Sequence, residues 1–290
     1  MEHQLTAAAE TKYHAGSRRW GMAWYGYLAI LILVGCQYLM FQKIEPVYTF
    51  FTPIQWWSYI FLADALVYGR EKRSLIVSYP LEFFIMLVLS NVCWLMFEGY
   101  NIVLRNWYYV NLAPQPWQRI LGASVAFATI FPGIFVTADL LKSFGLFRNL
   151  PSRPVAISPA FLAGSFWGGL AAVILPLVFP SPYVFGLVWL GFFFLLEPVN
   201  YWMKNGSIYS DLEQGNKQRL WLLLAAGAIC GLLWEFWNYW ANAKWIYTVP
   251  FTKHLKYFEM PLLGFLGFPP FALECFALYH FTRGLLQPRR

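Results

Sequence analysis

Six acidic residues lie within or beside long apolar runs of this sequence, where a charged side chain is costly. They are Asp64, Glu98, Asp139, Glu197, Glu235 and Glu274. A carboxylate at membrane depth is strongly disfavoured unless it is paired, hydrated or protonated, so each of these acids is a functional candidate by default. A buried carboxyl can hold a proton at neutral pH and deliver it to a substrate, which makes general acid catalysis the first chemistry to consider.

Two of these acids are each followed by an asparagine three residues later. Glu98 precedes Asn101 and Glu235 precedes Asn238, and this spacing places both members of a pair on one helix face. We expect each amide to hydrogen-bond its carboxyl and orient it, so these two Glu–Asn pairs are the first catalytic candidates. The alternative interpretation is a polar clamp that holds membrane helices together.

The other intramembrane acids differ in depth. Glu274 lies in the middle of an apolar run, after Phe-Pro-Pro-Phe-Ala-Leu, and is a further catalytic candidate. Asp64 and Glu197 lie near the inner ends of their runs and are secondary candidates. Pairing with Arg70 or Lys204, or reaching toward the interface, is the structural alternative for these two acids.

Aromatic residues make up 21% of the sequence and cluster around the Glu–Asn pairs. The candidate substrate-binding residues are Trp94, Trp107, Tyr109, Trp237, Trp245 and Tyr247. Trp and Tyr also favour the headgroup level of a membrane, so an interfacial belt is the alternative to a pocket. A pocket of such rings would suit a long apolar ligand, whose cationic forms are stabilised by aromatic faces.

The composition predicts an integral membrane protein. Hydrophobic residues form 59% of the 290 residues and charged residues only 12%, about half the usual charged share of a globular protein. The basic residues form no single patch, which argues against nucleic-acid binding. The four cysteines have no CxxC spacing and no nearby histidine, so we expect no metal and no cofactor.

The apolar runs that carry the candidate residues are expected to form about eight transmembrane helices in an all-α, polytopic membrane bundle. The predicted spans are 21–41, 52–69, 80–103, 119–141, 158–179, 183–203, 219–241 and 260–282, with a break considered at Pro198. A cytoplasmic N-terminus places fifteen of the 21 basic residues inside, so both termini are predicted to lie on the cytoplasmic side of a bacterial-type inner (plasma) membrane. The exception is the last outer loop, which carries Lys244, Lys253 and Lys256.

The two halves of the sequence repeat each other. A shift of 137 positions matches Glu98 with Glu235 and Asn101 with Asn238, and a gap brings Asp64 onto Glu197. We therefore predict two parallel four-helix repeats, with a site at their interface. The expected divisions are an N-terminal tail (1–19), a first repeat (20–145), a linker (146–157), a second repeat (158–284) and a C-terminal tail (285–290).

Two short motifs carry a resemblance to a known family. The stretch from Phe97 to Tyr109 resembles the acid-x₈-Trp-x-Tyr signature of integral-membrane lycopene cyclases of the bacterial and fungal type, and Pro80-Leu81-Glu82 is similar to their Pro-Leu-Glu-Glu element. Phe83 stands in place of the second acid of that element, and the two motifs occur in reverse order. The resemblance implies metal-free cyclisation of a polyene by an intramembrane carboxylic acid. The same residues also resemble a group of uncharacterised bacterial multi-span proteins.

Three functions fit the sequence. The first is binding or modification of a long apolar lipid or isoprenoid, with cyclase-like acid catalysis by an intramembrane Glu. The second is a non-catalytic membrane subunit of a pigment, quinone, respiratory or photosynthetic complex, and the third is a proton-coupled small-solute transporter. The expected partners are membrane lipids or an apolar isoprenoid, with other membrane subunits as a further option.

Overall fold

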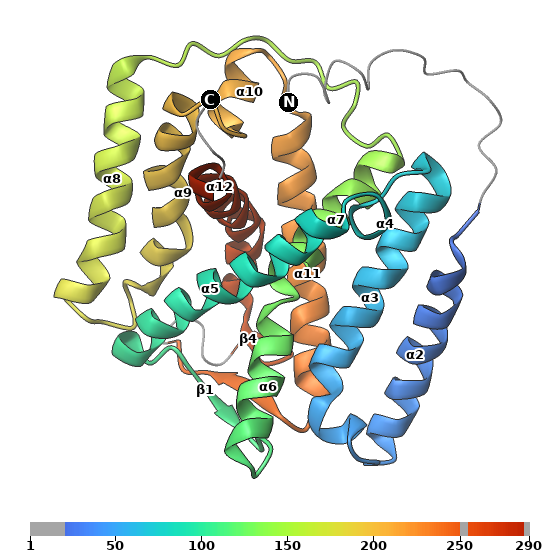
Figure 1. The fold of residues 1–290 in the computed structure, drawn as a ribbon. Coiled ribbons are helices and arrows are strands. Elements are labelled where there is room, and N and C mark those ends of the chain that lie inside the picture. The colour runs from blue at the N-terminus through green and yellow to red at the C-terminus, as the bar shows by residue number, and fades with distance from the viewer. Residues whose placement is uncertain (1–20, 250–254, 287–290) are drawn as a thin grey trace.

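The protein is a bundle of long helices with a short β-ribbon at one end (Figure 1). The computed structural model describes residues 21–249 and 255–286, so the tail at 1–19, Lys253 and the last four residues lie outside it. Seven helical segments within the described ranges are long and apolar enough to cross a membrane. The all-α, polytopic membrane class is therefore confirmed.

The first half of the chain begins with a helical hairpin and ends with a broken helix. Its elements are α2 (Trp24–Phe41), α3 (Val47–Glu71), α4 (Leu75–Ser78), α5 (Pro80–Leu104), β1 (Trp107–Val110), α6 (Pro116–Phe127) and α7 (Ile130–Ser143). Helix α3 matches the expected span 52–69 and is long enough to cross a membrane, at roughly 37 Å for its 25 residues. It is not among the seven apolar segments, because Gln55 and Asp64 lie within it and Arg70 and Glu71 end it.

The second half repeats this order of elements. It consists of α8 (Pro159–Val178), α9 (Phe185–Trp202), α10 (Ile208–Glu213), α11 (Gln218–Trp240), β2 (Lys244–Tyr247), β3 (Lys256–Tyr257), β4 (Met260–Pro261), a 3₁₀ helix (Leu262–Gly267) and α12 (Phe268–Leu286). Helices α8 and α9 correspond to α2 and α3, the short α10 to α4, and α11 with β2 to α5 with β1. The 3₁₀ helix and α12 take the places of α6 and α7.

The expected span at 119–141 lies within one apolar segment, Pro116–Ser143, and the break considered at Pro198 is absent. The span at 119–141 is divided between α6 and α7, and Ser90 of α5 bridges the break by donating to Phe127 O (2.5 Å) and accepting from Phe131 N (3.1 Å). Conversely, α9 continues through Pro198. Proline lacks an N–H, so it frees the carbonyl of Phe194, and Ser165 Oγ on α8 donates to that oxygen at 2.8 Å.

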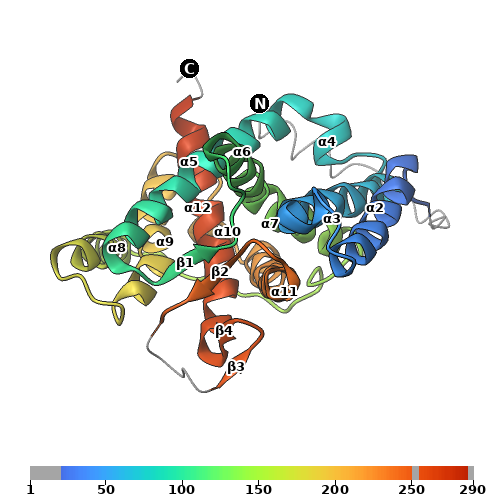
Figure 2. The ribbon, with the colours of Figure 1, turned by 90° about the horizontal axis from the view of Figure 1, so that it is seen from below.

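The strands β1 and β2 pair antiparallel and join the two halves. Figure 2, seen from below, shows this ribbon across the end of the bundle. Trp107 is paired with Tyr247 and Tyr109 with Trp245. Trp107 and Trp245 are equivalent in the repeat, as are Tyr109 and Tyr247. Replacing each residue by its equivalent turns one of these pairs into the other, as a two-fold axis requires. An axis through the ribbon fits the expected parallel repeats.

The end of the bundle opposite the ribbon is held by a second link between the halves. Arg283 of α12 forms a two-pronged ion pair with Glu82 at the start of α5, with Nε–Oε1 at 2.9 Å and Nη2–Oε2 at 3.0 Å. Tyr279 also donates to Glu82. Glu82 lies in the first turn of α5, where a negative charge suits the helix dipole. The halves are thus tied together at both ends.

Candidate functional site

One face of the ribbon consists of four aromatic side chains. Side chains alternate across a strand, so Trp107 and Tyr109 of β1 lie on the same face as Trp245 and Tyr247 of β2, whose residues they pair with. All four line one pocket of the described structure. Tyr108, on the opposite face, is 51% exposed. The ribbon therefore presents a wall of rings to the interior of the bundle.

Glu98 is held by three donors. Its Oε1 accepts hydrogen bonds from Tyr109 OH (2.5 Å), Trp94 Nε1 (3.0 Å) and Trp107 Nε1 (3.3 Å). An ionised carboxylate has acceptor atoms and no donor. Hydrogen bonds to it are charge-assisted and stronger than bonds between neutral groups. Three donors on one oxygen therefore fix the position of the Glu98 carboxyl.

Glu235 occupies the equivalent position with a different environment. Its Oε1 accepts from Tyr247 OH at 2.8 Å, and Tyr247 OH accepts in turn from Trp245 Nε1 at 2.8 Å. Glu235 is fully buried, and its Oε2 has no hydrogen-bond partner within the described residues. A buried, charged carboxylate with one oxygen unpaired is costly, so this environment suits the neutral carboxyl.

The two tyrosines beside these carboxyls are poor acids. Burial, together with the neighbouring Glu98, raises the pKa of Tyr109 above its ordinary value. Burial and Glu235 likewise raise the pKa of Tyr247. Both hydroxyls therefore keep their protons at neutral pH. They can donate to a carboxylate or, after rotation, relay a proton.

The asparagines serve the ribbon and not the carboxyls, which corrects the expected Glu–Asn hydrogen bonds. Asn101 Oδ1 accepts from the backbone N–H of Asn106 (2.9 Å) and Trp107 (3.1 Å), and its Nδ2 donates to Trp107 O (2.9 Å). Asn238 makes the matching pair of bonds with Trp245 N and O, both at 2.9 Å. Each asparagine fixes a strand against its helix, and the strand's aromatic residues then contact the carboxyl.

The pocket bounded by the ribbon has a volume of about 430 Å³. Its aromatic lining consists of Phe50, Trp56, Trp94, Trp107, Tyr109, Phe127, Trp189, Trp234, Trp245, Tyr247, Phe268 and Phe271. Five of the six expected binding residues are in this set. Trp237 is not, and its ring instead packs edge-on against Trp56 with the ring centroids 5.0 Å apart.

Trp56 and Trp189 are pocket residues that the sequence analysis did not select. Trp56 packs on Trp234 at 4.9 Å between ring centroids, and Trp189 packs on Phe271 at 4.8 Å. A signal was available, because the shift of 133 positions that matches Asp64 with Glu197 also matches Trp56 with Trp189. Both tryptophans extend the aromatic wall from the ribbon into the bundle.

Glu274 is buried close to the pocket without lining it. Its Oε1 accepts from the backbone N–H of Phe192 at 2.9 Å, and its Oε2 has no partner within the described residues. It lies three residues beyond Phe271, which does line the pocket. None of the three glutamates lines the pocket itself. Glu98 and Glu235 each accept a hydrogen bond from a tyrosine that does line it, whereas Glu274 accepts from a backbone N–H.

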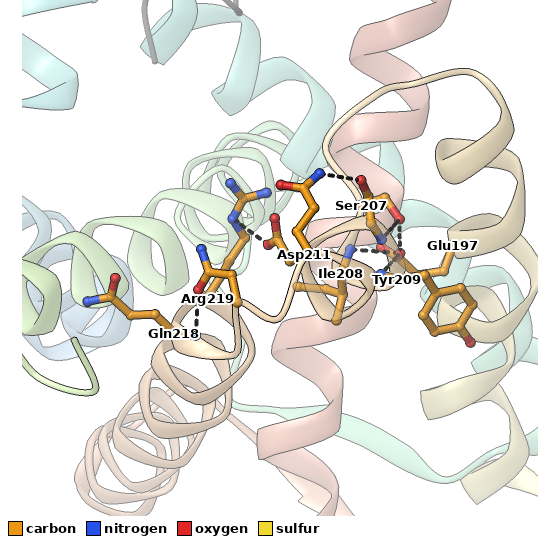
Figure 3. A network of polar contacts seen from close by, with 10 residues as sticks. Glu197, Ser207, Ile208, Tyr209, Asp211, Gln218 and Arg219 are labelled. Atoms are coloured by element: carbon orange, nitrogen blue, oxygen red, sulfur yellow. Dashed lines mark hydrogen bonds and ion pairs between the residues drawn. The ribbon is translucent and has the colours of Figure 1, made fainter. Parts of the chain in front are cut away.

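Asp64 and Glu197 hold short helices at the end of the bundle opposite the ribbon. Glu197 Oε2 accepts from Ser207 Oγ (2.8 Å) and Ile208 N (2.9 Å), as Figure 3 shows. Asp64 accepts from Ser74 Oγ (2.8 Å), Ile76 N (3.0 Å) and Tyr25 OH (2.6 Å).

These contacts replace the expected pairing with Arg70 and Lys204. Ser74 and Ser207 are the N-caps of α4 and α10, and each follows its acid by ten residues. The two acids therefore have the same structural role in the two halves.

The two motifs behind the lycopene cyclase resemblance lie apart. Glu82 and Glu98 are at opposite ends of α5, separated by roughly 24 Å at 1.5 Å per residue, so only the Glu98 motif reaches the pocket. Within the described residues, no three His, Cys, Asp or Glu side chains are grouped in a way that could hold a metal ion. No family model, curated protein or solved structure matches this chain.

Proposed function

We propose that this protein is a membrane enzyme that transfers protons to and from a long, unsaturated apolar molecule, such as an isoprenoid, bound in the aromatic pocket. The observation that carries the proposal is the pair of carboxyl–tyrosine contacts at one pocket. Glu98 and Glu235 each bond a tyrosine that lines it. The resemblance to lycopene cyclases points to the same class of chemistry.

The size of the pocket limits what part of a ligand it encloses. A volume of about 430 Å³ corresponds to on the order of 14 water-sized groups at roughly 30 Å³ each. That is enough for two or so isoprene units. A longer isoprenoid would place one end inside the pocket and extend through its opening.

The unequal environments of the two carboxyls suggest separate roles. Glu235 would supply a proton through Tyr247 to one carbon of a double bond, whose π electrons form the new C–H bond. The resulting carbocation would lie among tryptophan faces, which stabilise a desolvated cation by about 2 kcal/mol or more. A neighbouring double bond could then close a ring by forming a C–C bond.

Loss of a proton completes the reaction. Glu98 would accept a proton through Tyr109 from a carbon next to the cation, and the C–H electron pair would become a new double bond. One proton enters and one leaves, so the product is an isomer of the substrate and no oxidant is consumed. Return of a proton from Glu98 to Glu235 restores the starting state.

We also propose an orientation in a bacterial-type plasma membrane, with the ribbon on the outer side and both termini in the cytoplasm. Supporting this are the basic residues at the end opposite the ribbon, where Arg70, Lys72 and Arg73 lie around the end of α3. Positive residues concentrate on the cytoplasmic side of membrane proteins.

The test is isomer formation by the purified protein in deuterated water. Isoprenoid alkenes are incubated with the protein in nanodiscs, and products are analysed by mass spectrometry for one deuterium per turnover. Glu235→Gln and Glu98→Gln should each reduce product by 100-fold or more, at the lower end of about 10²–10⁴ for general acid–base catalysis. Glu197→Gln, remote from the pocket, is the matched control. Unchanged product formation in both Glu235→Gln and Glu98→Gln would refute the proposal.

A further inference from the structure

The opening of the pocket is basic, unlike its interior. Arg119 and Lys244 both line the pocket. Arg119 and its neighbour Ile120 are exposed, as is the lining residue Leu112, which marks this edge as the opening. Both basic residues belong to the outer segments, where the sequence breaks the usual rule that positive residues face the cytoplasm.

Arg119 is held in position at this opening. Its Nε donates to Ala113 O at 2.6 Å and its Nη2 to Pro114 O at 3.2 Å. The guanidinium has five N–H donors, and its Nη1 makes no hydrogen bond with the described residues. Lys244 differs, because it forms an ion pair with Glu259 at 2.6 Å.

The charge of Arg119 is not balanced by a carboxylate in the described part of the chain, where the ion pairs involve other residues. Arg119 also lies in the first turn of the twelve-residue helix α6, whose N-cap Gln115 makes no side-chain capping bond. The positive end of the helix dipole adds to the attraction for an anion. A positioned arginine suits a phosphate or carboxylate, which it can bind through two parallel N–H groups.

We propose that the ligand is an isoprenyl phosphate, with its anionic head at Arg119 and its apolar tail among the pocket tryptophans. This inference rests on the proposed function for the apolar pocket and specifies which end of the molecule enters it. The distal isoprene units would lie near Tyr109 and Tyr247, and the phosphate would remain at the opening. A neutral polyene would use the pocket without this anchor.

The test is ligand binding to the full chain in phosphatidylcholine nanodiscs, measured by quenching of tryptophan emission. The probes are geranyl phosphate, whose two isoprene units match the pocket volume, the uncharged geraniol and inorganic phosphate. One charge-assisted hydrogen-bonding group should make the phosphate ester bind about tenfold more tightly than the alcohol. Arg119→Gln should remove that tenfold difference and leave the affinity for geraniol unchanged. Lys256→Gln, on an exposed residue that does not line the pocket, should preserve it.

Several outcomes would overturn the inference. Equal affinities for the ester and the alcohol would do so, as would a difference that survives Arg119→Gln. Inorganic phosphate that binds as tightly as the ester would indicate an anion site without a role for the isoprenoid. Phosphatidylglycerol in the nanodisc could compete with the ester for Arg119. If it abolishes ester binding to the wild-type protein and has no effect on the Arg119→Gln variant, the head-group site belongs to a bulk phospholipid.

The two proposals fail separately. Alcohol binding and deuterium incorporation without ester discrimination would leave the enzyme proposal standing and remove the phosphate head. Ester discrimination that depends on Arg119, with no isomer formed, would leave the ligand class standing and remove the acid–base chemistry. Glu235→Gln should leave the ratio of the two affinities unchanged in either case.

Discussion

The two asparagines that fix the ribbon make unequal numbers of hydrogen bonds, which allows a quantitative prediction. Asn101 makes three bonds to the strand backbone and Asn238 makes two. At about 1 kcal/mol for each hydrogen bond, Asn101→Ala should destabilise its strand by roughly 3 kcal/mol and Asn238→Ala by roughly 2 kcal/mol. The long helices remain inserted, so the effect should appear as local opening of the ribbon and not as global unfolding.

Amide hydrogen exchange measured by mass spectrometry detects this opening directly. Because every 1.4 kcal/mol is a factor of ten, exchange in the peptide covering 106–110 should accelerate about 100-fold in Asn101→Ala. The peptide covering 244–247 should accelerate about 30-fold in Asn238→Ala by the same rule. Asn91→Ala is the matched control, since among the described residues the Asn91 side chain bonds only the Leu87 carbonyl of its own helix. Exchange that stays at the wild-type rate, or a larger effect of Asn238→Ala, would refute the hydrogen-bond reasoning.

Two further predictions concern packing and capping. A Cβ at Gly133 would lie 2.9 Å from Cζ3 of Trp56, so Gly133→Ala should displace that ring and destabilise the protein by about 1–3 kcal/mol. In the control Gly168→Ala, the new Cβ meets no atom of the described structure within 4 Å, so the melting temperature should be unchanged. Ser207→Ala should remove the cap of α10 and destabilise the fold by about 1 kcal/mol without changing geraniol binding, because Ser207 lies at the end of the bundle away from the pocket. A melting temperature unaffected in Gly133→Ala, or weaker ligand binding in Ser207→Ala, would contradict these explanations.

The sequence predicted the class, the approximate spans and the duplication because these depend on local composition. Apolar runs identify membrane helices, and the span limits at 158–179 and 219–241 differ from α8 and α11 by one residue at each end. Breaks in helices were less predictable, since they depend on partners distant in sequence. Ser90 is needed to bridge the gap between α6 and α7, and Ser165 satisfies the carbonyl that Pro198 frees.

The candidate site shows the same division between local and long-range information. Glu98 and Glu235 were found from their types and spacing, but the ribbon was not, because a four-residue strand gives little signal until its partner is known. Without the ribbon, the asparagines had no visible partner except the nearby carboxyls. The spacing from Asn238 to its strand is also one residue longer than that from Asn101. The connection absorbs this difference, since Arg105 is left-handed at the end of α5 and Ala241 is extended at the end of α11.

The two halves of the protein contain similar carboxyl sites, and differences between the halves make these sites unequal. Trp94 donates to Glu98, whereas the shift of 137 positions places Gly231 at the equivalent point of the second half. Glu235 therefore lacks that donor. Its side chain is fully buried, and its Oε2 has no hydrogen-bond partner within the described residues. Gly231→Trp is not a usable exchange, because a Cβ at Gly231 would collide with the Phe268 ring. The donor can instead be removed from the first half. Trp94→Phe takes one donor from Glu98 and should make the environments of the two carboxyls more alike. If their division into acid and base depends on this difference, Trp94→Phe should slow isomer formation while leaving the affinity ratio of the phosphate ester and alcohol unchanged.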